Sequence, residues 1–179
     1  MKTILAFAGS NSSTSINLQL VRYTTSLIKE EQTVVLNMVN YPFPMYSSDL
    51  EKEKGFSNSL AELHHEIVAA KGLIISVNEY NGNLSPYFKN LIDWLSRFDK
   101  TFIKSQKIFL MSTSPGKRGA VSAKELAHKM LTMMGAEVTS TFSLPSFNEN
   151  FDRAKGTITN KELDTLLEKE LQTFLDQLT

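Results

Sequence analysis

The order of the first structural elements follows from one stretch, Ala8-Gly9-Ser10-Asn11-Ser12-Ser13-Thr14-Ser15-Ile16-Asn17. It comes after a short apolar run, residues 4–8, that is typical of a buried parallel strand, and it precedes a helical pattern. The first amides of a helix have no partner within that helix, and the helix dipole adds partial positive charge there. Hydroxyl side chains around those amides predict a socket for an anion such as a phosphate monoester. The alternative interpretation is a polar loop with an ordinary N-cap.

The composition is that of a globular protein with no electrostatic attraction to nucleic acid or to membranes. The 179 residues are 41% hydrophobic and 21% charged, which suits a single domain, residues 1–179, with a substantial core. Lys plus Arg and Asp plus Glu balance at 19 each, so we expect neither a nucleic-acid nor a membrane partner. Cysteine is absent, which excludes disulfides, thiolate metal sites and thiol-based redox chemistry. Any redox chemistry must therefore rest on a bound cofactor.

Two further signals are missing from the sequence. The N-terminal apolar run is too short for the core of a signal peptide, and no apolar run approaches the length of a membrane span. We therefore expect a cytoplasmic protein. His64 and His65 are adjacent and cannot share a helix face, and His128 stands alone in a helical pattern. We interpret these histidines as ordinary residues and expect no metal site.

Apolar strand patterns alternate with helical patterns along the chain. The strand patterns cover about residues 3–8, 34–39, 72–77, 108–111 and 137–142. The helical patterns cover about residues 16–28, 60–68, 86–97 and 120–134, and a last helix is capped by Thr159. Residues 41–46, which contain two prolines, and 148–156 are expected to be irregular. The alternation predicts an α/β fold, a five-stranded parallel sheet in the order 2-1-3-4-5 with helices on both faces.

In that strand order, three unusual loops leave the carboxyl ends of adjacent strands, where ligands of such folds bind. One is the hydroxyl-rich loop. The second, residues 78–84, contains Tyr80 and a flexible Asn81-Gly82 corner, which offers a surface for a planar heteroaromatic ring. The third, residues 112–119, contains Lys117-Arg118, which are candidates to contact a second anionic ligand. The alternatives are a surface turn for Asn81-Gly82 and a solvated loop for Lys117-Arg118.

These loops resemble those of the NAD(P)H-dependent FMN reductase family of flavodoxin-like proteins. That family has a Gly-Ser-x-Arg-x-x-Ser-x-Asn phosphate loop, a Pro-Glu-Tyr-Asn segment followed by a Pro and a Lys-Asn-x-x-Asp-Trp helix, and a Ser-x-Gly loop. The similar segments here are residues 9–17, 78–81, Pro86, Lys89-Asn90, Asp93-Trp94 and 114–116. The resemblance covers about residues 2–145, and it implies a flavodoxin-like three-layer sandwich that binds FMN.

Carried over residue by residue, the resemblance implies three groups of cofactor-binding residues. They are Ser10, Ser12, Ser15, Ile16 and Asn17 for the phosphate, Glu79, Tyr80, Asn81 and Gly82 for the isoalloxazine ring, and Ser114, Pro115 and Gly116 for its far edge. Two positions depart from the family pattern. Ser12 stands in place of the loop Arg, which removes a cationic contact and is expected to weaken FMN binding. Asn78 stands in place of the Pro and is expected only to loosen its loop.

The resemblance also implies an enzyme in which the flavin carries the chemistry and no side chain acts as a catalytic acid or base. NADPH or NADH would deliver a hydride to flavin N5 and leave. A small-molecule acceptor, which is a quinone, an azo compound or free flavin, would then take its place, so we expect ping-pong kinetics. Two alternatives remain open: a flavodoxin-type electron carrier, although such carriers are usually acidic and this chain is neutral, and a flavodoxin-like domain that no longer binds flavin.

The helix predicted from residue 86 to about residue 98 has a wide apolar surface, about 160° against the roughly 100° needed to pack on one sheet. One edge contains Phe88, Ile92 and Leu95, and the other contains Tyr87, Trp94 and Phe98. We expect the second edge to contact another subunit, which predicts a homodimer or homotetramer through helix 86–98. The alternative is a helix that is buried deeply within its own domain.

Overall fold

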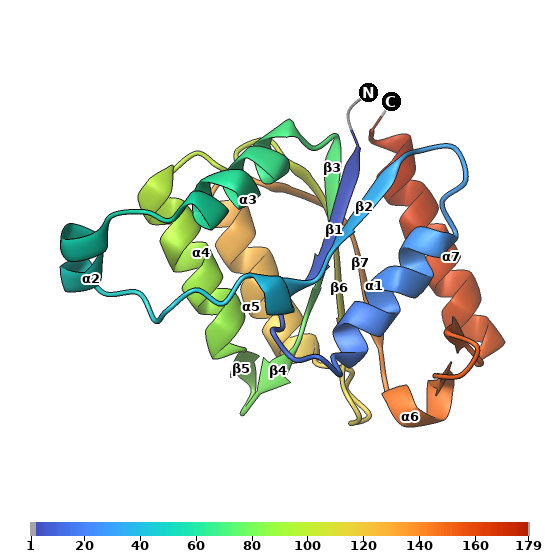
Figure 1. Cartoon of the computed structure of the whole chain (residues 1–179). Helices are drawn as coiled ribbons and strands as arrows, with labels where there is room; N and C mark the ends of the chain where they lie inside the picture. The colour runs from blue at the N-terminus through green and yellow to red at the C-terminus, as the bar shows by residue number, and fades with distance from the viewer. Residues whose placement is uncertain (1–2, 179) are drawn as a thin grey trace.

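A computed structural model describes residues 3–178 and contains a five-stranded, all-parallel sheet. Its strands are β1 (Ile4–Ala8), β2 (Thr33–Leu36), β3 (Gly72–Val77), β6 (Lys107–Thr113) and β7 (Glu137–Leu144). They lie in the order β2-β1-β3-β6-β7, which confirms the predicted strand order and fold class. Because all neighbours are parallel, the carboxyl ends of the strands meet at one edge of the sheet, the lower edge in Figure 1.

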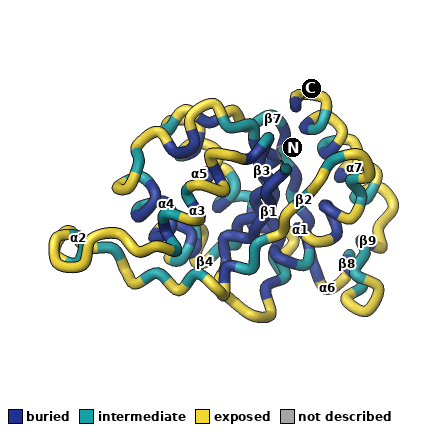
Figure 2. Tube along the Cα trace, turned by 45° about the horizontal axis from the view of Figure 1, so that its top comes forward, coloured by how far each residue is buried: buried dark blue, intermediate teal, exposed yellow. Residues whose placement is uncertain are grey.

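Helices cover both faces of this sheet (Figure 1). One face carries α1 (Ile16–Ser26) and α7 (Lys161–Asp176), and the other carries α3 (Asn58–Ala69), α4 (Pro86–Phe98) and α5 (Val121–Met133). Alternate strand residues enter the two cores, so that Leu5 and Phe7 of β1 face α3 and α4 while Ile4 and Ala6 face α1 and α7. The central strands are therefore buried on both faces (Figure 2). Among residues 3–178, no helix combines the length and the apolar character needed to cross a bilayer.

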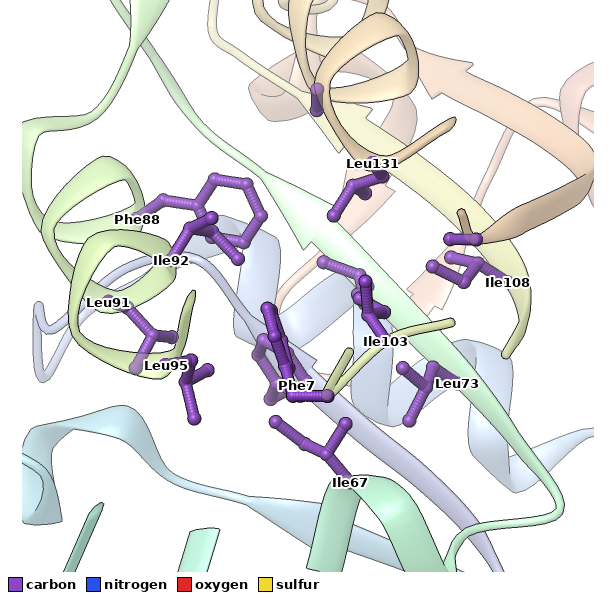
Figure 3. Close-up of a cluster of buried hydrophobic side chains, with 14 of the residues drawn as sticks. Phe7, Ile67, Leu73, Phe88, Leu91, Ile92, Leu95, Ile103, Ile108 and Leu131 are labelled. Carbon is purple, nitrogen blue, oxygen red and sulfur yellow. The ribbon is translucent and has the colours of Figure 1, made fainter. Parts of the chain in front are cut away.

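The start of α4 is fixed against the end of β1, close to the hydroxyl-rich loop. The Ser85 hydroxyl accepts a hydrogen bond from Phe88 N–H (3.1 Å) and donates one to the Gly9 carbonyl (2.8 Å). Phe88 is fully buried in the core shown in Figure 3. A Cβ at Gly9 would lie 2.7 Å from the Phe88 ring, so this contact requires a glycine. The Ser85-Pro86 helix start predicted from the sequence is confirmed.

Two predicted boundaries are wrong because an asparagine side chain interrupts the expected pattern. The second strand ends at Leu36 instead of residue 39, since Asn37 Oδ1 accepts a hydrogen bond from Val39 N–H and starts a 3₁₀ turn, η1 (Met38–Asn40). The last helix is capped by Asn160 instead of Thr159, because the Asn160 side chain accepts hydrogen bonds from the first-turn amides. The fourth and fifth strands also extend two residues further than predicted, to Thr113 and Leu144.

Several short elements are absent from the sequence prediction. They are α2 (Ser48–Lys54), the hairpin of β4 (Glu79–Tyr80) and β5 (Asn83–Leu84), α6 (Phe147–Asn150), and the hairpin of β8 (Phe151–Asp152) and β9 (Thr157–Ile158). Each is too short for a hydrophobic periodicity to reveal it. The β4–β5 hairpin is the important one for function, because it lies at the carboxyl edge of the sheet (Figure 1).

Residues 41–46, which we call the strap, are irregular as predicted and lie against α4. The Asn90 amide accepts a hydrogen bond from Tyr46 N–H (2.7 Å) and donates one to the Pro44 carbonyl (2.9 Å). Trp94 Nε1 donates to the same carbonyl (2.8 Å), and its side chain is buried. Two polar side chains of α4 thus hold a proline-containing segment that has few amide donors of its own.

The strap covers part of the α4 edge that was expected to contact a second subunit. The Tyr87 hydroxyl lies within hydrogen-bond distance of the Met38 and Tyr41 carbonyls, at 3.2 and 3.0 Å. Phe98, at the other end of the helix, keeps 36% of its surface exposed and packs edge-on against the ring of Phe56. The alternative interpretation, burial within the same chain, therefore holds for Trp94 and in part for Tyr87, whereas Phe98 stays accessible.

Candidate functional site

The three loops predicted to converge line a common pocket of about 210 Å³, which we call the α1 pocket. Its lining residues are Ser10, Ser12, Thr14, Ser15, Ile16, Asn17, Asn78, Glu79, Tyr80, Thr113, Ser114 and Pro115. Among the described residues, the predicted site residues that do not line it are Asn81, Gly82 and Gly116. Three residues, Thr14, Asn78 and Thr113, line it without having been predicted, and each is next to a residue that was. The topology of the sheet explains why these distant segments meet.

A second pocket of about 320 Å³ adjoins the first and lies beside the start of α4; we call it the α4 pocket. Its lining residues are Ser10, Asn11, Phe43, Met45, Asn78, Tyr80, Ser85, Pro86, Tyr87 and Asn90. Ser10, Asn78 and Tyr80 line both pockets and form their shared boundary. The strap contributes Phe43 and Met45, which give this pocket an apolar wall.

The hydroxyl-rich loop is shaped by its own side chains. The Ser10 hydroxyl accepts a hydrogen bond from Ser12 N–H (3.3 Å), and the Ser12 hydroxyl accepts one from Thr14 N–H (3.3 Å). The hydroxyls of Ser12 and Thr14 also lie 3.2 Å apart. These short-range bonds contribute to the conformation of the loop. Among the described residues that line the α1 pocket there is no Lys or Arg, so its attraction for an anion depends on hydroxyls and backbone amides.

The loop ends at the N-terminus of α1. Ser15 is the N-cap, and its hydroxyl accepts a hydrogen bond from Leu18 N–H (3.1 Å). The amides of Ile16 and Asn17 come earlier in this first turn, where a helix has no internal acceptors for them. With the positive end of the helix dipole, these amides are suited to bind an anion at this end of the α1 pocket. The N-cap of the alternative interpretation is present, and the same geometry leaves room for the predicted anion socket.

The side chain of Asn17, in contrast to its backbone amide, connects elements of the fold. It is buried, and its Oδ1 accepts hydrogen bonds from the Ser76 hydroxyl (2.7 Å) and from Thr113 N–H (3.1 Å). Its Nδ2 donates to the Thr113 carbonyl (3.2 Å). Asn17 therefore ties α1 to the ends of β3 and β6, which leaves its backbone N–H, in the first turn of α1, for a ligand.

The β4–β5 hairpin carries the aromatic residue of the site. Tyr80 keeps 56% of its surface exposed beside both pockets. Asn81 and Gly82 have φ values of 54° and 73°, the left-handed conformations that a tight hairpin turn requires. A Cβ at Gly82 would meet no atom within 4 Å, so open space lies next to this backbone. The backbone is thus the tight turn proposed as the alternative, and the turn leaves Tyr80 free to contact a ring.

The loop after β6 completes the site. The Ser112 hydroxyl donates to the Gly119 carbonyl (2.7 Å), and a Cβ at Gly119, where φ is 58°, would lie 2.8 Å from the Leu144 carbonyl oxygen. Lys117 and Arg118 are exposed on this loop, and Arg118 Nη2 lies 3.2 Å from the Ser122 hydroxyl. Among the described residues that line the two pockets, neither cation is included.

One site residue has an unusual feature that the sequence did not reveal. Asn78 directly follows β3, and its Oδ1 is shielded from solvent yet accepts no hydrogen bond from any described residue. Buried acceptors in native proteins nearly always have a donor, so an exception requires an explanation. The sequence marked Asn78 only as a residue that would loosen its loop.

Most of the chain is similar to a known protein family. The model of the family described as NADPH-dependent FMN reductase matches residues 2–149. A quinone reductase of Escherichia coli K12 is 30% identical over 95 residues, which cover 53% of this chain and 50% of that protein. This chain therefore spans about half the length of that relative. An NAD(P)H-dependent FMN reductase of Pseudomonas aeruginosa is 23% identical over 171 residues, covering 94% and 91% of the two chains.

The fold is also similar to that of solved structures. The flavoenzyme NAD(P)H:(acceptor) oxidoreductase FerB from Paracoccus denitrificans superimposes with a TM-score of 0.80 at 24% identity. The match covers 99% of this chain and 97% of that one. At this level of identity the likeness shows a shared fold, whereas the chemistry depends on the residues of the site itself.

Proposed function

The chain belongs to the NADPH-dependent FMN reductase family, and from this premise we propose that it binds FMN and transfers electrons from NAD(P)H to a small-molecule acceptor. The observation that carries the proposal is the convergence of the α1 N-terminus, the β4–β5 hairpin and the Ser114 loop on one pocket. A nucleotide has an anionic end and a planar end. It therefore requires hydrogen-bond donors for the anion and a flat surface for the ring within one pocket.

The residues of the site fit FMN part by part. The first-turn amides of α1 and the hydroxyls of Ser10, Ser12 and Ser15 suit the phosphate. Tyr80 offers an exposed ring for stacking, and the open backbone at Gly82 permits close approach of a ring edge. Asn78 lines the same pocket, and its Oδ1 has no hydrogen-bond donor among the described residues.

When bound, FMN supplies the redox chemistry, in which a hydride from NADPH or NADH is received at N5 and is passed to a quinone, an azo compound or free flavin. The chain's own residues position the reactants. Backbone N–H groups of the hairpin and of the Ser114 loop are suited to stabilise negative charge on the pyrimidine side of the ring. The α4 pocket, with Phe43 and Met45 on one wall, provides an apolar surface for nicotinamide and acceptor in turn. One shared site predicts ping-pong kinetics, so initial-rate lines should be parallel and not intersect.

The proposal is tested by reconstituting purified protein with FMN and following its visible absorbance before and after NADPH is added. Bleaching of the flavin band by NADPH, with re-oxidation by a quinone, is the expected result. Uptake of FMN without bleaching by either NADPH or NADH would indicate an electron carrier. Failure to take up FMN at all would contradict the proposal and favour a domain that has lost its cofactor. The same assay compares the two nicotinamide cofactors.

We further propose that the active form is a homodimer or homotetramer in which α4 contributes to the contact. The surface that α4 leaves to a second copy is centred on Phe98 and its neighbour Phe56, both partly exposed. Contacts of this kind bury apolar surface that a monomer would leave in water. A purely monomeric mass in solution at micromolar protein would contradict this part of the proposal. A cytoplasmic location remains a prediction from the sequence.

A further inference from the structure

Asn78 stands at the boundary between the two pockets. It lines both the α1 pocket, which includes the first turn of α1, and the α4 pocket, which adjoins it. FMN has its phosphate and its ring at opposite ends, joined by the ribityl chain. Ser15, Asn78 and Tyr80 all line the α1 pocket, so a cofactor with its phosphate at Ser15 and its ring at Tyr80 would have its ribityl chain near Asn78.

The Asn78 side chain has an acceptor to offer. Its Oδ1 has no donor among the described residues and is shielded from solvent. The torsion about the Cβ–Cγ bond of asparagine is broad, so the amide group turns at small cost. The ribityl chain is the part of FMN richest in hydroxyl donors, and an unpartnered acceptor gains most from a donor that arrives with the ligand.

We infer that Asn78 is a cofactor-binding residue whose amide turns toward the pocket and accepts a hydrogen bond from a ribityl hydroxyl of FMN. This inference rests on the proposed function. Proline, the family residue at this position, has no side-chain acceptor. The hydrogen bond to Asn78 therefore compensates in part for the binding free energy that is lost because residue 12 is a serine and not the arginine of the family pattern.

The test is Asn78→Leu, which keeps a similar volume and removes the acceptor. We expect the variant to bind FMN about tenfold more weakly, as measured by flavin fluorescence, which corresponds to about 1.4 kcal/mol. The melting temperature of the FMN-free protein should stay equal or rise, because no unpartnered oxygen is left. Asn83→Leu in the same hairpin is the matched control, since among the described pocket residues Asn83 is not included, and it should leave FMN affinity unchanged.

Lumiflavin, which has the ring but lacks the ribityl chain, identifies the part of the ligand involved. Wild type and Asn78→Leu should bind lumiflavin equally; an equal loss with lumiflavin and FMN would place the contact on the ring and overturn the inference. Unchanged FMN affinity in Asn78→Leu would overturn it too, while leaving the proposed function intact. Wild-type protein that binds no FMN would instead contradict the proposed function itself.

A second variant covers the case in which Asn78→Leu does not fold. Asn78→Asp keeps a hydrogen-bond acceptor on a side chain of the same shape. Its binding is measured with riboflavin, which has the ribityl chain but no phosphate for the new carboxylate to repel. The variant should bind riboflavin at least as tightly as wild type. Weaker riboflavin binding by a folded Asn78→Asp variant would overturn the inference.

Discussion

The Glu79 carboxylate accepts a hydrogen bond from the backbone N–H of Ala123, with 3.1 Å between Oε2 and N. Glu79 begins the β4–β5 hairpin, and Ala123 lies in the first turn of α5. Ala120, at the N-cap position of α5, has no side chain that can cap the helix. Glu79 supplies this cap from a distant segment, and its negative charge suits the positive end of the helix dipole. The hairpin that carries Tyr80 is thereby fixed to α5.

Replacing Glu79 by Ala should lower the free energy of unfolding by about 1 kcal/mol, the usual effect of losing a helix cap. FMN affinity should fall as well, because the hairpin is no longer held against α5. Glu79→Gln keeps the hydrogen-bond acceptor without the charge, so its free energy of unfolding and its FMN affinity should fall less than in Glu79→Ala. Urea denaturation and flavin fluorescence measure the two quantities. Wild-type stability in Glu79→Ala would show that the bond to Ala123 does not cap the helix.

Ser12→Arg should strengthen FMN binding about fivefold, which corresponds to the roughly 1 kcal/mol of an exposed ion pair. Residue 12 lines the α1 pocket, where no Lys or Arg occurs among the described lining residues. The gain should shrink as salt is raised, because exposed charges are screened. Ser12→Gln, which adds length without charge, is the control. An equal gain in riboflavin affinity would argue against a contact to the phosphate.

Asp99 connects the end of α4 to α3 through bonds to its carboxylate. Its Oδ1 accepts hydrogen bonds from the hydroxyl and the N–H of Thr101 (2.7 and 2.8 Å), and its Oδ2 lies 2.9 Å from His64 Nε2. The bonds from Thr101, followed by the contact with His64, lower the pKa of Asp99 from 3.8 to about 2. The ionised form is therefore favoured in the folded state.

This shift predicts a contribution of Asp99 to acid stability. A carboxyl group with a lower pKa in the folded state stabilises the protein above the unfolded-state pKa, and this contribution is lost as pH falls through the folded-state pKa. Between about pH 4 and pH 2, the free energy of unfolding should fall less steeply in Asp99→Asn than in wild type. The difference should be modest because the carboxylate is partly exposed. Equal slopes would show that Asp99 titrates alike in both states.

The sheet order could be predicted because apolar strands that alternate with helices leave few possible topologies. Asn17 shows where such prediction ends. Its place in the phosphate-loop pattern suggested a ligand contact, but its side chain bonds to Ser76 and Thr113, which lie 59 and 96 residues away in the sequence. Local patterns do not report contacts across such separations, so a scaffold role and a binding role look the same in the sequence.

Trp94 and Asn78 illustrate the same limit in different ways. The wide apolar surface of the α4 helix suggested a second subunit, whereas the carbonyl of Pro44 in the chain's own strap accepts the hydrogen bond from Trp94. The position of the strap follows from tertiary packing, since its prolines exclude a regular structure that a pattern could reveal. The unpartnered oxygen of Asn78 likewise exists only once the neighbouring loops are in place.

Gly82 and Gly156 offer a matched test of where the ring lies. Both are hairpin glycines, with φ of 73° and 69°, and at neither would a Cβ meet an atom within 4 Å. Each replacement by Ala should therefore lower the free energy of unfolding by a similar amount, about 1 kcal/mol, because side chains disfavour positive φ. Gly82 follows Tyr80 in the site hairpin, so Gly82→Ala should weaken FMN binding severalfold, whereas Gly156→Ala should not. If both variants bind FMN like wild type, the ring does not approach the backbone of Gly82.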